Sequence, residues 1–365
     1  MIKDKLLING RYKTLKRLGV GGMGEVWQCE DTILNRKVAL KFVNEAYSIN
    51  NPKSTKILKD EARLGAKLIG HPNVVTILDY GIYEDKAISM KIYYIVMECV
   101  EGINLNTWIN TYSKTIDKKT FYNINLFIAW EIVKSINYAH SKKILHRDIK
   151  PLNIFLSNMG YTKIGDFGIS RFTEEATRTH TMWQFNTPAY CAPEQWNGEK
   201  PTAKTDVYQI GCTLYQLFTG KLPFNTDNLP SLMNAHLNSE PISPRRINSY
   251  ISEELSDFIV QALEKKDEDR VALWAISDTI SKEIQGKYNM EVDVHLSGAD
   301  VQELVNEITE FTIDQLKEDK FNYTYLDFSE ALSEAMQLIL AGITNIEVNK
   351  IEGDSEEEVA VTETE

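Results

Sequence analysis

The sequence lacks the features of a membrane-spanning or secreted protein. No run among its 365 residues approaches the roughly 18 consecutive apolar residues that cross a bilayer. The N-terminal stretch MIKDKLLINGRYK has too short an apolar segment between its charges for a secretory signal. The four cysteines, at positions 29, 99, 191 and 212, form no CxxC pair and no zinc-binding spacing. We therefore expect reduced core thiols, no membrane span and a cytoplasmic location.

Acidic residues outnumber basic ones, 52 to 40, and the excess is concentrated at one end. The net charge is −12, yet from Glu283 onward the chain has 21 acidic and 4 basic residues, which leaves the preceding part mildly basic. A strongly basic surface is the usual footprint of nucleic-acid binding, so this small excess predicts no nucleic-acid partner. With 43% hydrophobic residues, the chain is able to bury a large core and to form more than one domain.

The stretch ILHRDIKPLNIFLSNMGYTKIGDFG, residues 144–168, places three acid or amide side chains in a pattern suited to phosphoryl transfer. Asp148 lies in a loop, and Asn153 directly precedes residues 154–164, which read as strand, turn and returning strand. The two ends of such a hairpin meet. We therefore expect Asn153 and Asp166 to reach the same point in space.

Asn153 and Asp166 offer hard oxygen ligands, which Mg²⁺ prefers alongside phosphate oxygens and water. Asp148, left free of the metal, is suited to accept the proton of a substrate hydroxyl. Chance occurrence of each short motif in an ordinary core hairpin is the alternative interpretation. It is disfavoured because the motifs HRD and DFG stand in this order with Asn153 between them. We predict a phosphoryl-transfer site with a divalent cation, Mg²⁺ or also Mn²⁺.

The motifs HRDIKPLN and DFG are similar to the catalytic loop and the metal-binding motif of eukaryotic-like (Hanks-type) bacterial serine/threonine protein kinases. The resemblance implies an enzyme that transfers the γ-phosphoryl group of ATP to serine or threonine in a protein substrate. Lys150, two residues after Asp148, is the serine/threonine signature and would act on the transferring group. The implied fold is α+β and bilobal, with a five-stranded antiparallel sheet and a regulatory helix in the N-lobe and a mainly helical C-lobe.

A glycine loop near the N-terminus supports the resemblance. A GxGxxG pattern alone also fits a dinucleotide-binding fold, in which the third glycine opens a helix. Here β-type residues follow the third glycine, and a VALK strand comes about fifteen residues later. The resemblance implies these ATP-binding positions: Gly19, Val20, Gly21, Gly24, Val26, Ala39, Lys41, Met97, Glu98 and Val100.

Residues 54–70 have apolar positions at helical spacing and end before a His-Pro pair. In the resemblance this segment is the regulatory helix. Glu61 would be the carboxylate that pairs with Lys41, and Lys41 would hold the α- and β-phosphates. The alternative for Glu61 is the ordinary one for a helix carboxylate, a solvated surface position.

The segment after the DFG motif resembles the kinase activation segment and ends in the APE motif at residues 192–194. Thr187 stands where serine/threonine kinases place a substrate-positioning threonine. Asn186 replaces the usual glycine before it, and asparagine tolerates left-handed backbone geometry. Thr179 and Thr181 resemble the paired autophosphorylation site of bacterial kinases. A threonine-rich surface loop is the alternative.

Two further matches predict contacts that support the structure and take no part in phosphoryl transfer. Asp206 matches the aspartate that braces the backbone of the catalytic loop. Arg270 matches the arginine that pairs with Glu194 of the APE motif. Together the matches extend over about residues 10–284.

We divide the chain into a kinase N-lobe (1–98), a hinge and C-lobe (99–284), a small acidic α/β accessory domain (285–351) and a disordered acidic tail (352–365). A homodimer through the N-lobe is a further expectation.

Two alternative functions remain. A nucleotide-binding pseudokinase scaffold is disfavoured because every catalytic position is filled. A small-molecule kinase on a related fold is disfavoured by the complete activation segment, which a protein kinase uses to hold a peptide.

Overall fold

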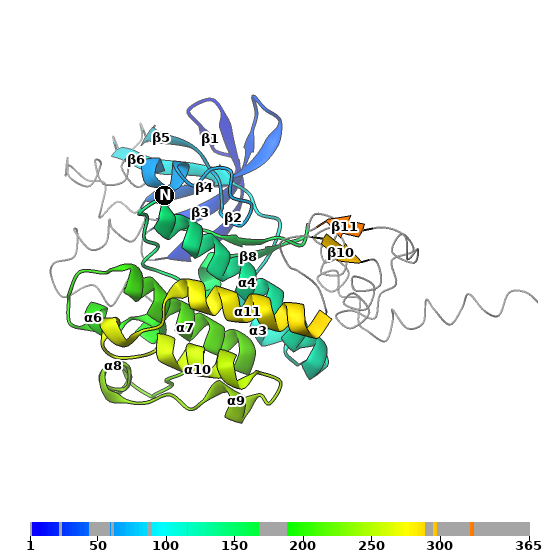
Figure 1. Ribbon diagram of the computed structural model, residues 1–365. Helices are drawn as coiled ribbons and strands as arrows, with labels where there is room; N and C mark the ends of the chain where they lie inside the picture. The colour runs from blue at the N-terminus through cyan, green and yellow to red at the C-terminus, as the bar shows by residue number, and fades with distance from the viewer. Residues whose placement is uncertain are drawn as a thin grey trace, which may run out of the picture.

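The computed structural model describes residues 2–21, 24–43, 59, 62–85, 90–114, 116–167, 188–288, 295–297 and 322–324. These residues form a sheet-rich N-lobe above a helical C-lobe (Figure 1). Among the helices described, none is both long enough and apolar enough to cross a membrane.

The N-lobe is built on one antiparallel sheet with strand order β1-β2-β3-β4-β6-β5. Its strands are β1 (Leu7–Ile8), β2 (Tyr12–Gly21), β3 (Gly24–Asp31), β4 (Arg36–Val43), β5 (Ile77–Asp85) and β6 (Met90–Glu98). The sequence predicted five strands, and β1 is a sixth, paired antiparallel with β2. Two residues are too few to carry a visible alternation, which is why the sequence pattern missed this strand.

The N-terminal segment is held to the sheet by a buried threonine. The Thr14 hydroxyl accepts a hydrogen bond from the Leu6 amide at 2.8 Å and donates one to the Lys3 carbonyl at 2.6 Å. Ile8 is fully buried in a small apolar cluster that also contains Trp27. The segment thus completes one face of the sheet.

The predicted regulatory helix is described in part. Lys59 and residues 62–66 are helical, and the segment ends near Gly70, which has a left-handed φ of 99°. Such a glycine is a common helix terminator. Glu61 lies outside the described residues.

The C-lobe is helical, as predicted. Its helices are α3 (Leu105–Tyr112), α4 (Lys118–Ser141), α6 (Pro193–Trp196), α7 (Ala203–Thr219), α8 (Leu229–Asn238), α9 (Pro244–Ile247), α10 (Glu253–Ala262) and α11 (Leu273–Tyr288). The Asp117 side chain caps the N-terminus of α4, and Gly220, with a φ of 70°, ends α7. Helices α4 and α7 are buried over most of their length and form the centre of the lobe.

A small sheet joins the hinge to the catalytic segment, with strands β7 (Gly102–Asn104), β8 (Ile154–Ser157) and β9 (Thr162–Ile164). The hairpin β8–β9 is the one that the sequence predicted. A side chain at Gly102 would lie 1.9 Å from the Leu156 carbonyl oxygen, so this close approach of backbones requires glycine. Within the acidic region 285–351, the described strands β10 (His295–Ser297) and β11 (Asn322–Thr324) pair antiparallel.

Candidate active site

A cavity of about 420 Å³ is lined by residues of both lobes, and it contains most of the predicted site. It is lined by Leu18, Gly19, Val20, Gly24, Val26, Ala39, Lys41, Val75, Met97, Glu98, Val100, Asn104, Asp148, Lys150, Leu152, Asn153, Phe155, Gly165 and Asp166. Of the predicted ATP-binding residues, Gly21 is not in this lining; it pairs with Gly24 at the end of the β2–β3 hairpin. The volume is in the usual range for a small-molecule site.

On the N-lobe side, Lys41 projects from the buried strand β4 and is 6% exposed. Its Nζ lies 2.8 Å from Asp166 Oδ1, so this N-lobe lysine forms an ion pair with the acid that follows β9. Burial acts to raise the pKa of Asp166, but the charge and the hydrogen bond of Lys41 outweigh it. The net pKa is below its ordinary value, and the carboxylate stays ionised.

On the C-lobe side, Asp148 is held by its own loop. Lys150 Nζ lies 2.9 Å from Asp148 Oδ2, and Asn153 Nδ2 donates to the same oxygen at 3.0 Å and to the Asp148 carbonyl at 2.8 Å. The Gly165 amide donates to the Asn153 carbonyl at 2.9 Å. The structure therefore brings Asn153 next to Asp166, as the hairpin spacing predicted.

The catalytic loop is braced from below by α7. Asp206 is fully buried, and its two carboxylate oxygens accept the backbone amides of His146 at 2.9 Å and Arg147 at 2.6 Å. Gln209, one turn later on α7, accepts the Ile149 amide at 2.8 Å. The predicted bracing role of Asp206 is confirmed, and Gln209 adds a second brace that was not predicted from the sequence.

His146 connects the loop to the DFG segment. Burial lowers its pKa, so the imidazole is neutral. Its Nε2 donates to the Gly165 carbonyl at 2.9 Å, while Nδ1 accepts the Asp148 amide at 3.3 Å. One neutral ring thus joins the backbone amide of Asp148 to the carbonyl of Gly165, the residue before Asp166.

The pair of Glu194 and Arg270 is also confirmed. The guanidinium donates to both carboxylate oxygens, at 2.8 and 2.7 Å, and the Thr205 hydroxyl donates to the same carboxylate at 2.6 Å. Burial acts to raise the pKa of Glu194, but Arg270 and Thr205 outweigh it and lower the pKa. This pair anchors the APE motif to the base of the C-lobe.

The donor set fits a hard divalent cation held partly by a nucleotide. In the part of the chain that is described, no group of three or more His, Cys, Asp and Glu side chains could hold a metal by itself. The amide nitrogen of Asn153 donates to Asp148, which leaves the side-chain oxygen of Asn153 available beside the Asp166 carboxylate. One amide oxygen and one carboxylate, completed by phosphate oxygens and water, are the ligands that Mg²⁺ takes at nucleotide sites.

Several predicted residues lie outside the described part of the chain: Glu61, Thr179, Thr181 and Thr187. Their roles stay predictions. Six further residues line the cavity that were not predicted from the sequence: Leu18, Val75, Asn104, Leu152, Phe155 and Gly165. Four of these are ordinary apolar residues, and Asn104 is a polar residue that belongs to no recognisable motif. Gly165 directly precedes Asp166, a position that marked it as a neighbour of the site.

Comparison with known proteins agrees with this geometry. The protein kinase domain family matches residues 12–282. The chain is 38% identical over 258 residues to the serine/threonine-protein kinase PrkC of Bacillus subtilis, a match that covers 71% of this chain and 38% of PrkC. It is 34% identical over 265 residues to the serine/threonine-protein kinase PknB of Mycobacterium tuberculosis, with 72% of this chain and 41% of PknB covered.

Among solved structures, the PknI kinase domain of Mycobacterium tuberculosis aligns with a TM-score of 0.58 and 20% identity, over 78% of this chain and 99% of that domain. This likeness shows the fold. The chain spans about 40% of the length of the curated relatives that it matches. Protein kinases of this kind use ATP and a divalent metal ion. With the family match over residues 12–282 and the Lys41, Asp148, Asn153 and Asp166 constellation in one cavity, the chain belongs to the protein kinase family, in its bacterial Hanks-type group.

Proposed function

We propose that this chain transfers the γ-phosphoryl group of ATP to serine or threonine hydroxyls of a protein substrate, with Mg²⁺ as the metal. The observation that carries the proposal is the position of Asp148. Its carboxylate lies between Lys150 and Asn153 and faces the cavity that Lys41 and Asp166 also line.

The proposed roles follow from charge and position, because phosphoryl transfer requires little covalent chemistry from the protein. Lys41 binds the α- and β-phosphates and orients the triphosphate. Asp148 accepts the hydroxyl proton, and Lys150 neutralises charge on the transferring group. Asn153 and Asp166 would hold the divalent cation, which supplies further charge neutralisation at the phosphates.

The test is transfer of radiolabel from ATP by the full chain beside Asp148→Asn. We expect label on serine or threonine, and its loss by at least about a hundredfold in the variant. Equal labelling by both proteins would reject the role of Asp148. Absence of label from the parent, with a general acceptor protein and Mg²⁺ present, would reject the kinase function in favour of a pseudokinase scaffold.

We propose in addition that Thr179 and Thr181 are autophosphorylated and that the modification activates the enzyme. Each phosphate would add about two negative charges, and Arg147 of the catalytic loop is a cation suited to receive a phosphate. Phosphosite mapping of protein incubated with ATP and Mg²⁺ tests this. Two unmodified threonines in active protein would reject it.

A homodimer through the N-lobe is proposed from two adjacent apolar side chains. Ile33 and Leu34, between β3 and β4, are 69% and 55% exposed. Neighbouring exposed apolar side chains favour a contact surface. Light scattering of the parent and of Ile33→Asp tests the proposal: a parent dimer that becomes monomeric supports it, and a monomeric parent contradicts it.

The acidic region 285–351 is proposed as an accessory domain followed by a tail at 352–365, because it contains no catalytic spacing and the family match ends at residue 282. Comparing the specific activity of the full chain before and after limited proteolysis near residue 289 would show whether the acidic region inhibits the enzyme.

A cytoplasmic location is proposed because ATP chemistry is intracellular and the four cysteines are free thiols.

A further inference from the structure

One face of α4 carries aromatic residues and lysines in alternation. Four residues, the last of them the C-cap, follow one another at intervals of four: Trp130, Lys134, Tyr138 and Lys142. Residues at this spacing share one face of a helix. Lys134 Nζ lies 4.2 Å from the centre of the Trp130 ring, and Lys142 Nζ lies 5.4 Å from that of Tyr138. These four residues, the α4 ridge, are therefore a row of cations on an aromatic base.

The surroundings of the α4 ridge are positively charged. The His71 ring packs on Tyr138, with the ring centres 4.7 Å apart. Burial lowers the pKa of His71, and the charges of Lys134 and Lys163 lower it further, so the ring is neutral at pH 7. Lys163 itself pairs with Glu98 at 2.8 Å. The lysine charges on this face thus act together on one ring.

The α4 ridge has no acidic neighbour on its own helix that could neutralise it at the surface. Glu131, the only acidic residue of α4, is buried, and burial raises its pKa. Its carboxylate accepts the backbone amide of Thr162 at 2.9 Å. Lys142 and the adjacent Lys143 are exposed, and within the described part of the chain no carboxylate pairs with either. This end of the ridge is therefore open to an anionic partner.

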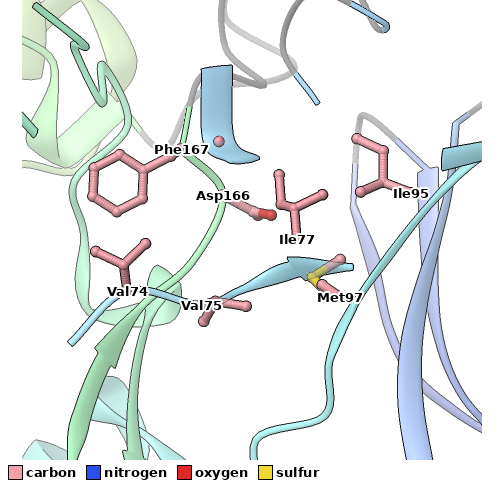
Figure 2. Close-up of a pocket in the computed structure, with 8 residues that line it drawn as sticks. Val74, Val75, Ile77, Ile95, Met97, Asp166 and Phe167 are labelled. Carbon is pink, nitrogen blue, oxygen red and sulfur yellow. The ribbon is translucent and has the colours of Figure 1, made fainter. Parts of the chain in front are cut away.

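The α4 ridge lies apart from the catalytic cavity. The loop 71–76 separates the two: His71 contacts Tyr138, whereas Val75, four residues later, lines the catalytic cavity. Figure 2 shows Val75 at the wall of a second cavity, of about 10 Å³, that Asp166 also lines. Neither the residues of the α4 ridge nor its neighbouring lysine at 143 line either cavity. A partner on the ridge would leave the nucleotide site open.

The chain itself contains a segment of opposite charge. Residues 352–365, the acidic tail, include seven acidic residues and no lysine or arginine, whereas residues 289–351 include 13 acidic and 3 basic residues. Helix α11 ends at Tyr288, so 63 residues join it to the tail. A tether keeps the tail at an effective concentration that a free peptide reaches only in the millimolar range. Weak exposed ion pairs are then able to hold it, most strongly at low salt.

The spacing of the charges also matches. Lys134 and Lys142 are eight residues apart on α4, which is about 12 Å at 1.5 Å per residue. Asp354 and Glu358 are four residues apart in the acidic tail, which is about 13 Å in an extended chain. One extended segment is therefore able to place a carboxylate at each of the two lysines.

The aromatic residues of the α4 ridge disfavour nucleic acid as the partner. Single-stranded nucleic acid binds through bases that stack on exposed aromatic rings. Trp130 is only 4% exposed, and both rings lie under a lysine. The ridge thus presents ammonium groups without a stacking surface, which suits carboxylates.

We propose that the α4 ridge, together with Lys143, is the docking surface for the chain's own acidic tail, residues 352–365. The contact is electrostatic and lies on the C-lobe outside the catalytic cavity. It goes beyond phosphoryl transfer, because it assigns a binding surface that the chemistry does not use.

Zero-length cross-linking of the full chain with a carbodiimide tests the proposal, because this reagent joins a carboxylate to an amine only where the two touch. Lys350 is the last basic residue, so trypsin releases residues 351–365 as one peptide for mass spectrometry. At low salt we expect cross-links from this peptide to Lys142 or Lys143 at least about fivefold above those to two control lysines. In about 1 M salt, where the screening length is about 3 Å, this excess should disappear.

The control lysines are Lys221 and Lys266, which are exposed elsewhere on the C-lobe. Equal cross-linking of the tail to the ridge lysines and to the control lysines would overturn the proposal. So would an excess that persists in high salt, because the contact would then not be electrostatic.

An exchange of charges provides the second test. Replacing Glu356, Glu357 and Glu358 by lysine should lower the cross-links to the ridge at least about fivefold. Adding Lys142→Glu and Lys143→Glu to this triple variant should restore a cross-link, now with the carboxylate on the ridge and the amine on the tail. Adding the same change at the two control lysines should restore nothing, and equal restoration by both would contradict the proposal. Melting temperatures verify that each variant is folded.

Other partners and other positions of the tail give distinct results. In a mixture of ¹⁵N-labelled and unlabelled chains, cross-linked products that contain both isotopes would assign the docking to a second copy and overturn the proposal. A labelled single-stranded oligonucleotide that binds the parent but not the Lys142→Glu, Lys143→Glu variant would assign the ridge to nucleic acid. The rise in melting temperature with ATP and Mg²⁺ should be the same in the parent and in the triple tail variant. A larger rise in the variant would place the tail in the catalytic cavity instead.

Discussion

In the C-lobe, one continuous apolar core extends from α4 through α7 to the catalytic strands β8 and β9, whereas the N-lobe sheet has a separate and smaller cluster on one face. The catalytic loop rests on the larger core through Asp206 and Gln209, which bond three of its backbone amides. The N-lobe half of the site depends instead on Lys41 and on a helix that rests on β5 through a glycine. The loop that carries Asp148 is therefore held by several buried hydrogen bonds, while the phosphate-binding half of the site depends on fewer contacts.

The largest effect is expected at the base of the C-lobe. Arg270→Ala would leave the Glu194 carboxylate buried without its partner, and we expect unfolding free energy to fall by about 3 to 5 kcal/mol. Denaturant unfolding measures it. Lys282→Ala, which removes an exposed pair with Asp278, is the control and should cost under about 0.5 kcal/mol. Equal losses in the two variants would mean that the C-lobe pair is no more important than a surface pair.

The second effect concerns the brace under the catalytic loop. Asp206→Asn replaces one acceptor oxygen by an amide group, so the amide of His146 or Arg147 loses its partner. We expect kcat to fall about a hundredfold, equivalent to about 2.7 kcal/mol, while KM for ATP changes less than about threefold. Asp257→Asn, on the exposed surface of α10, serves as the control. A rise in KM without a fall in kcat would contradict the separation between the two halves.

The third prediction weakens the N-lobe cluster alone. Ile8→Ala deletes a fully buried side chain of β1, and we expect a loss of about 2 kcal/mol, at the low end for such truncations because the segment lies at the sheet edge. The adjacent Leu7→Ala, at a 49% exposed position, should lose under about 0.5 kcal/mol. Thermal unfolding measures both. A fall in kcat as large as that of Asp206→Asn would show that the two cores are not separate.

The smallest effect is a pH dependence of the C-lobe. Burial, with a smaller contribution from Lys265, lowers the pKa of His236 to about 3. The unfolded chain binds this proton near pH 6.5, whereas the folded protein does not. Stability from the neutral ring is therefore complete above pH 6.5 and is lost as the pH falls towards 3. Between pH 7.5 and 5.5 we expect a loss of about 1 kcal/mol.

Urea midpoints at the two pH values test this dependence, with His236→Gln as the non-titrating variant. The variant should show a loss smaller by about 1 kcal/mol over the same range, with the remainder shared by other buried groups such as His146. An identical loss in parent and variant would place the titration elsewhere.

The sequence predicted the residues whose chemistry is specified by motifs, and it missed those whose role depends on tertiary position. Lys41, Asp148, Asn153 and Asp166 were found because their types and spacing are rare together, and the structure places all four on one cavity. Leu152 and Phe155 line the same cavity but read as ordinary apolar residues beside the loop. Only the folding of β8 against the hinge gives them a position in the site.

Strand β1 and Gly65 were missed for different physical reasons. A two-residue strand has no periodicity, so β1 becomes visible only through its pairing with β2 and the hydrogen bonds of Thr14. A glycine in a helical pattern usually indicates lower helix propensity and nothing more. At Gly65 an added Cβ would lie 2.3 Å from Ile77 Cδ1, and this close approach comes from a strand twelve residues later in the chain.

The most direct test of this comparison is hydrogen exchange of the full chain without nucleotide, resolved to the level of single amides. We predict that the amides of His146, Arg147 and Ile149, bonded to Asp206 and Gln209, exchange only through global unfolding of the C-lobe. Amides of the helical segment 62–66 should exchange at least about tenfold faster, through local opening of the helix from β5. Equal protection of the two segments would show that the two halves of the site are held with equal stability.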